Sequence, residues 1–206
     1  PARTGIITIK DNAGIAAAQN ITLNQKENPL RTDLMALYDA LGGTNWAEAK
    51  KTNWNSAEPI ETWGGVTVTD GIMTKLNLSG FGLKGQLPEV IGSFTDITSL
   101  NLGSNPDLTG PLPQVIGNLV KLETLNAVTT GLQGPLPASM GNLVNLTNLQ
   151  LNKNNISGTI PVEWAGMTAL KNLGMYETQL SGPLPDAIFT GWKHIGTLLL
   201  NDNPKL

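Results

Sequence analysis

The stretch that decides the fold runs from Leu146 to Pro161 and reads LTNLQLNKNNISGTIP. Similar segments return every 24 or 25 residues from Leu76 to the end of the chain. Each copy holds an apolar-x-apolar triplet and, further along, a Leu-Pro or Ile-Pro pair: Leu87-Pro88, Leu112-Pro113, Leu136-Pro137, Ile160-Pro161 and Leu184-Pro185. Self-similarity at this period predicts a solenoid, in which each unit supplies one short strand and buries its apolar side against its neighbours.

The triplets predict which side chains point inward. Because side chains alternate along a strand, the two outer residues of each triplet face the core and the middle one faces solvent. The triplets are Leu76/Leu78, Leu100/Leu102, Leu125/Ala127, Leu149/Leu151, Leu173/Met175 and Leu198/Leu200. We expect them to stack into a parallel sheet.

Three residues after each triplet comes a position where buried amides can satisfy backbone groups in a tight bend. Asparagine occupies it in three units, as Asn105, Asn154 and Asn203. The other units carry Phe81, Thr130 and Thr178, so we expect an incomplete asparagine ladder.

The pattern L-x-x-L-x-L-x-x-N-x-L-x-G-x-I/L-P resembles the leucine-rich repeat of the plant-specific subclass, and the resemblance covers residues 29–206. It implies an α/β solenoid with a parallel β-sheet on the concave face and irregular or 3-10 segments on the convex side. Residues 73–206 would form five full units and a truncated sixth. Residues 29–72 resemble the helical N-terminal cap of such proteins but lack the cysteine pair of plant receptors. In this respect the chain is similar to bacterial, Bacteroidetes-like cell-surface members.

The region before the repeats predicts a hairpin and a helix. Strands over residues 5–10 and 19–25 flank an Asn/Gly turn, and residues 1–28 resemble the terminal strands of an upstream immunoglobulin-like domain plus a linker. A helix is expected to start at Thr32 as N-cap and to end at Gly42-Gly43. Its apolar stripe would cover the first coil of the solenoid: Leu34, Leu37, Tyr38 and Leu41.

The repeat register assigns the large aromatic residues to the core. Trp164 and Trp192 fall at positions that hold aliphatic or aromatic core residues in the other units. Three further tryptophans, Trp46, Trp54 and Trp63, could form carbohydrate-stacking platforms, but packing within the cap is the favoured interpretation. His194, the only histidine, is expected to be solvated.

Composition restricts the function. The formal charge of −3 provides no basic footprint for nucleic acid, and no apolar stretch is long enough for a membrane span. The absence of cysteine excludes disulfides and thiolate metal sites. No catalytic, metal or nucleotide-binding motif occurs, so we expect neither an enzyme nor a cofactor. The chain starts without Met and stops within a repeat, which we interpret as a fragment or a processed form. The resemblance implies an exported or cell-surface protein, with or without a lipid anchor upstream of this fragment.

Function is therefore expected on the outward strand residues. Their most varied chemistry gathers in the later repeats, at Gln150, Asn152, Lys153, Tyr176, Glu177 and Asp202. Tyrosine beside charge is typical of interface anchors, which favours a protein or peptide ligand bound on the concave face. A carbohydrate-binding surface module and a structural spacer stay open as alternatives, and the oligomeric state is undetermined by the sequence.

Overall fold

A computed structural model describes the backbone of residues 7–10 and 16–19 and the whole of residues 28–206. The chain divides into two compact units, residues 1–32 and 33–206. In the first, β1 (Ile7–Lys10) pairs antiparallel with β2 (Ala16–Gln19). The first expected strand is present. The second was misplaced, because the pairing of Lys10 with Ala16 makes β2 begin earlier than predicted. The expected turn and residues 20–25 lie outside the described residues.

The first helix, α1, spans Pro29–Ala40. The expectation of an N-cap at Thr32 was wrong, because Thr32 lies inside the helix. Asn28 caps it instead: its Oδ1 accepts the N–H of Leu30 at 3.1 Å. Proline suits the first helical position, where its missing N–H costs nothing. The helix ends as expected before Gly42, which has φ 69°.

Aromatic side chains form the centre of the N-terminal cap. Trp46, Trp54 and Trp63 are 2%, 6% and 1% exposed. Trp54 packs against both of the others with ring centroids 5.0 Å apart, and Tyr38 of α1 stacks on Trp54 at 6.0 Å. Each indole N–H donates to a backbone carbonyl, for example Trp46 to Leu41 at 2.9 Å. The packing interpretation is therefore confirmed, and the sugar-platform interpretation of these tryptophans was wrong.

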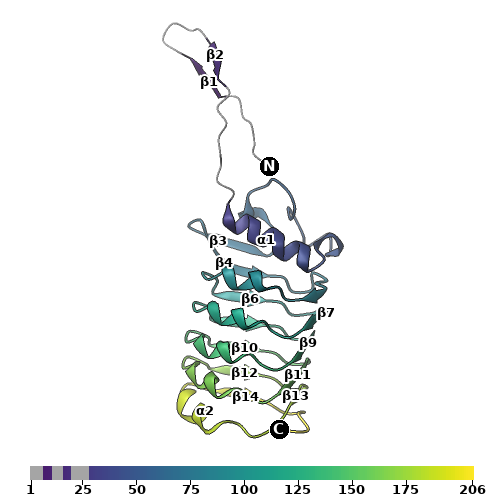
Figure 1. Cartoon of the computed structure of the whole chain (residues 1–206), viewed down its shortest axis with the longest axis vertical. Helices are drawn as coiled ribbons and strands as arrows, with labels where there is room; N and C mark the ends of the chain where they lie inside the picture. Colours follow the sequence, from purple (N-terminus) through teal and green to yellow (C-terminus); the bar gives the residue numbers. More distant parts are fainter. Residues whose placement is uncertain (1–6, 11–15, 20–27) are drawn as a thin grey trace. The chain divides into compact units, whose positions relative to one another are not determined.

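Seven strands form one long sheet, in the order β14-β12-β10-β8-β6-β4-β3 (Figure 1). The cap contributes an antiparallel hairpin of β3 (Val66–Thr69) and β4 (Ile72–Asn77). From β4 onward all pairing is parallel, through β6 (Ser99–Asn101), β8 (Thr124–Asn126), β10 (Asn148–Gln150), β12 (Asn172–Gly174) and β14 (Thr197–Leu199). Each triplet pairs in the register that the period predicts, with Leu149 between Leu125 and Leu173.

A second parallel sheet, which the sequence analysis did not foresee, lies after the bends. Its order is β13-β11-β9-β7-β5. The strands are β5 (Gly85–Gln86), β7 (Asn105–Gly110), β9 (Thr130–Gly134), β11 (Asn155–Gly158) and β13 (Gln179–Leu180). They are short, and all but β13 carry a glycine, so their sequences lack the β-branched runs that usually indicate strands.

Short helical turns return the chain to the long sheet. In four units this turn is a 3-10 helix with proline at its N-cap: η3 (Glu89–Ser93), η4 (Gln114–Asn118), η5 (Ala138–Asn142) and η6 (Val162–Gly166). In the fifth it is α2 (Asp186–Gly191), one residue longer. The extra residue changes the closing hydrogen bond: the N–H of Trp192 bonds the carbonyl four residues back, whereas that of Met167 bonds three back.

The two tryptophans of the repeats lie in the core, as predicted. Trp164 is fully buried and Trp192 is 4% exposed. The indole of Trp164 donates to the carbonyl of Pro137 at 2.9 Å, and that of Trp192 donates to the carbonyl of Trp164 at 2.8 Å. Their indoles therefore link consecutive units by polar as well as apolar contacts.

The buried asparagines bind the backbone as expected. Asn105 donates from Nδ2 to the carbonyls of Leu78 and Leu102, at 2.9 and 2.7 Å. Its Oδ1 accepts the N–H groups of Gly82 and Leu83. One side chain thus joins two successive units.

Threonine fills the places where we expected the ladder to be interrupted. The hydroxyls of Thr130 and Thr178 donate to Oδ1 of Asn154 and Asn203, both at 2.5 Å. The asparagine ladder is incomplete, as expected, and at these two units a hydroxyl supplies the donor to the next asparagine. Phe81 takes the same position in the first unit and contacts Trp46 of the cap instead.

Candidate functional site

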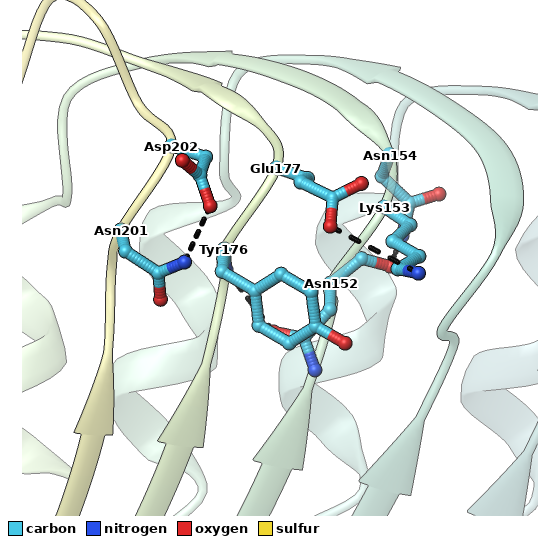
Figure 2. A network of polar contacts seen from close by, with 7 residues as sticks. All are labelled: Asn152, Lys153, Asn154, Tyr176, Glu177, Asn201 and Asp202. Carbon is cyan, nitrogen blue, oxygen red and sulfur yellow. Dashed lines mark hydrogen bonds and ion pairs between the residues drawn. The ribbon is translucent and has the colours of Figure 1, made fainter.

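The predicted ligand-binding residues gather where β10, β12 and β14 end (Figure 2). We call this set the polar patch: Gln150, Asn152, Lys153, Tyr176, Glu177 and Asp202. Gln150 is the last residue of β10, and the other members follow the three strands directly. Because these strands are parallel neighbours in register, residues separated by one repeat lie side by side.

The charged members of the patch flank the tyrosine ring. Lys153 Nζ lies 5.9 Å from the centre of the Tyr176 ring and 3.9 Å from Glu177 Oε1. Both charged side chains are about half exposed, at 47% and 51%. Such an exposed ion pair contributes little to stability, since water competes for both partners. The arrangement therefore places a cation and an anion beside a partly exposed aromatic ring.

Two amide members form a fixed hydrogen-bonded chain. Gln150 Oε1 accepts from Asn152 Nδ2 at 2.9 Å, and Asn152 Oδ1 accepts the N–H of Tyr176 at 3.0 Å. Asn152 is only 4% exposed, so the expectation that it faces a ligand was wrong. Its amide is used by the neighbouring unit, and its role is to hold the backbone at Tyr176.

Gly174 makes this amide chain possible. It is buried, and a Cβ placed on it would lie 2.2 Å from Gln150 Oε1 and 2.7 Å from Asn152 Nδ2. In the preceding units the same position holds Asn101 and Asn126, whose Oδ1 atoms accept the N–H two residues later. The missing side chain at Gly174 leaves space into which the longer Gln150 extends.

The position of Lys153, Glu177 and Asp202 has a left-handed backbone in every unit. These three residues have φ of 60°, 52° and 57°. Ser104 and Thr129 share the conformation, with φ of 58° and 56°. This is a repeated turn that few L-residues adopt without cost. It directs all these side chains the same way at the end of the strands, which brings the charges of successive units together.

Two carboxamides beside the patch were missed by the sequence reasoning. Asn148 and Asn172 are direct neighbours in β10 and β12 and are partly exposed. Asn148 Oδ1 accepts from Gln150 Nε2 at 2.9 Å, whereas no hydrogen bond forms on the side chain of Asn172 within residues 28–206. Their outward position could have been found, because it lies two residues before the middle of each triplet.

Other candidate chemistry is sparse in the described residues. His194 is exposed, as expected. Within residues 7–10, 16–19 and 28–206 no three His, Asp or Glu side chains gather in a way that could hold a metal ion. None of the helices described here has both the length and the apolar character needed to cross a membrane.

Comparison with known proteins defines the class of fold. Residues 145–167 match the family model Leucine Rich Repeat. The fold is shared with the ectodomain of the Arabidopsis thaliana receptor kinase GASSHO1/SCHENGEN3, solved in complex with CASPARIAN STRIP INTEGRITY FACTOR 2. That ectodomain is 31% identical with a TM-score of 0.75, over 84% of this chain and 21% of that one. The molecule is thus a leucine-rich repeat solenoid.

Two further structures show the same fold. A plant ice-binding protein is 26% identical with a TM-score of 0.75, over 84% of this chain and 55% of that chain. The structure of the BIR3–SERK2 complex from Arabidopsis thaliana contains a chain that is 27% identical with a TM-score of 0.66, over 84% of this chain and 95% of that one. The present chain therefore spans about a fifth of the first structure and about half of the second.

Proposed function

We propose that this chain is a non-enzymatic binding module that takes a protein or peptide ligand on the face of its long sheet. The observation that carries the proposal is the half-buried Tyr176, with Lys153 and Glu177 beside the ring and Asp202 in the next unit (Figure 2). An aromatic ring among charges of both signs suits a protein interface, where Tyr anchors are enriched.

The comparisons support this proposal by analogy. One related ectodomain was solved with CASPARIAN STRIP INTEGRITY FACTOR 2, and another related chain was solved in the BIR3–SERK2 complex. Because the fold alone does not determine function, the residues of the polar patch carry the argument for this chain.

The test compares capture of extracellular proteins by the parent and by a variant carrying Lys153→Ala, Tyr176→Ala and Glu177→Ala. The matched control carries Asp96→Ala and Lys121→Ala, which removes another exposed ion pair, 2.6 Å long, from loops that follow the 3-10 turns. We expect a partner that binds the parent and the control and is lost from the patch variant. Equal capture by all three proteins would exclude the patch as the site.

Carbohydrate binding is the second candidate, and the partly exposed carboxamides of the neighbouring Asn148 and Asn172 favour it. Amides can bind sugar hydroxyls, and an aromatic ring can stack on a sugar face. The two candidates separate in one measurement, because a glycan ligand would be found on a glycan array and competed by free oligosaccharide. A spacer role would follow if neither proteins nor glycans bound.

We do not propose ice binding for this chain, although it shares its fold with the plant ice-binding protein. A regular ice surface needs the same side chain repeated along a row. Here the row in the middle of the triplets changes from Asn77, Asn101 and Asn126 to Gln150, Gly174 and Leu199.

We further propose that the protein is exported or lies on the cell surface, with or without a lipid anchor. We propose that it resembles the bacterial, Bacteroidetes-like cell-surface proteins of this fold. The extracellular receptors of the same fold and the cysteine-free cap support this proposal. In this arrangement residues 1–28 end an upstream immunoglobulin-like domain, residues 29–72 cap the solenoid and residues 73–206 form its repeats. Detection of the full protein on intact cells with an antibody against the repeats would test it.

A further inference from the structure

We infer that the bound partner segment is an extended peptide with a carboxylate at one end and a basic side chain about six residues away. This inference rests on the proposed function and specifies its ligand. It comes from the order of charges along the end of the long sheet. A cation lies at the first unit, the second and third units are uncharged, and the last three carry Lys153, Glu177 and Asp202.

The cation is Lys50 of the cap. Its Nζ donates to the carbonyl of Ser79 at 2.6 Å, and a Cβ on Gly80 would lie 2.8 Å from that nitrogen. The ammonium group therefore occupies the place that the side chains of Ser104, Thr129, Lys153, Glu177 and Asp202 take in the later units. Phe81 lies below it, with the ring centre 5.9 Å away.

The ammonium group of Lys50 can accept a charged partner and still has N–H donors for it. One of its three N–H donors is used by Ser79, and Lys50 forms no ion pair with any residue in the described part of the chain. A ligand carboxylate reaching this end would meet an ammonium group that is already held in place. The entropy cost of ordering that side chain would be correspondingly small.

The opposite end carries an excess of negative charge. Glu177 pairs with Lys153 at 3.9 Å, whereas the hydrogen bond of Asp202 within residues 28–206 is with the neutral amide of Asn201, at 2.5 Å (Figure 2). The last three units thus hold two carboxylates, one lysine and the ring of Tyr176. A ligand arginine could pair with a carboxylate there and place its guanidinium plane against the ring.

The second and third units carry no charge at the same positions. Ser104 and Thr129 have hydroxyls, and Gly103 and Val128, which precede them, are uncharged. A charged ligand residue over this middle part would lose water without gaining a partner, which disfavours it. The surface therefore selects uncharged residues between the two charged ends.

The strand spacing determines the separation of the charges. Four strand steps separate β4 from β12, and at about 4.8 Å each they span roughly 19 Å. An extended peptide advances about 3.3 Å per residue, so this span corresponds to about six residues. A peptide with adjacent charges could reach only one end.

The test uses pools of short synthetic peptides with randomised uncharged residues. One pool carries Glu and Arg about six residues apart, a second carries them adjacent, and a third carries two Arg at the longer spacing. We expect the immobilised parent to retain the first pool about five-fold better than the other two, since each end contributes a partly exposed charge pair.

Lys50→Glu should reverse the preference. With acidic groups at both ends, this variant should retain the pool with two Arg best, and Lys50→Gln should lose the preference for Glu without gaining one for the second Arg. Lys84→Glu is the control, because it makes the same charge change at the residue just before β5, on the second sheet. Thermal unfolding of each variant would check that the solenoid is intact.

The inference is overturned if Lys50→Glu retains the three pools in the same order as the parent does. It is also overturned if the parent retains all pools equally or retains none. The proposed function survives any of these results if Tyr176→Ala still abolishes capture of a protein partner. Capture that persists in Tyr176→Ala would instead remove the proposed site itself.

Discussion

Replacement of Asn154 by alanine should destabilise the solenoid more than any other single change of a polar side chain near the patch. Asn154 is 5% exposed and donates to the carbonyls of Ala127 and Leu151 at 2.8 and 2.9 Å. Its Oδ1 accepts the hydroxyl of Thr130 at 2.5 Å. One side chain therefore satisfies groups of two units.

The magnitude follows from these three contacts. A typical intramolecular hydrogen bond contributes about 1 kcal/mol net, and a buried polar group left without a partner costs about 1 to 3 kcal/mol. Part of this cost is recovered, because the Thr130 hydroxyl already lies 3.3 Å from the carbonyl of Ala127 and can turn to it. We therefore expect Asn154→Ala to lower the free energy of unfolding by about 3 kcal/mol.

Urea denaturation followed by circular dichroism and tryptophan fluorescence measures this loss. The control is Asn155→Ala at the next position, where the side chain is exposed and bonds to no residue of the described part, so the change should stay below about 0.5 kcal/mol. A double-mutant cycle with Thr130→Val should give a coupling of roughly 1 kcal/mol. Equal stability of the Asn154→Ala and Asn155→Ala proteins would refute the argument that the buried amide joins the units.

Three further changes test other parts of the structure. Thr129→Gly should raise the free energy of unfolding by about 1 kcal/mol, because a β-branched residue with φ 56° is strained, and thermal melting that shows a loss would contradict this. Gly174→Ala should displace the Gln150 amide and cost about 2 kcal/mol, visible as shifted side-chain amide signals in NMR spectra; unshifted signals would count against the close contact. Asn28→Ala should lower the free energy of unfolding by about 1 kcal/mol, because the N–H of Leu30 loses its cap. Helix content that falls on heating as it does in the parent protein would contradict the cap.

The start of α1 could have been predicted correctly from the sequence. Asn28 followed by Pro29 is a common order for an N-cap and a first helical residue. The prediction of Thr32 as the N-cap missed this order. The apolar stripe was unaffected, because Leu34, Leu37, Tyr38 and Leu41 depend on the helical period and not on the first residue.

The alternation of side chains along a strand predicts the exposure of some members of the polar patch and fails for others. The two-residue period correctly places Tyr176 outside the core. Lys153 and Glu177 lie outside it because the backbone turns there, with φ of 60° and 52°. The period fails for Asn152, because burial there depends on the empty space over Gly174 in the next unit. The role of Lys50 was also missed, since the cap carries its ammonium group to the position of a repeat 29 residues away.

The sequence by itself determined the repeat, the in-register stacking of the triplets and the core positions of Trp164 and Trp192. These follow from periodicity, because every unit must bury the same apolar positions against its neighbours. Only the tertiary structure decided how the polar groups pair. The second sheet, the threonine links of the ladder, the buried amide of Asn152 and the place of Lys50 all depend on contacts between units. Such contacts are set by which side chains face each other across about 4.8 Å, and the pattern within one unit does not contain that information.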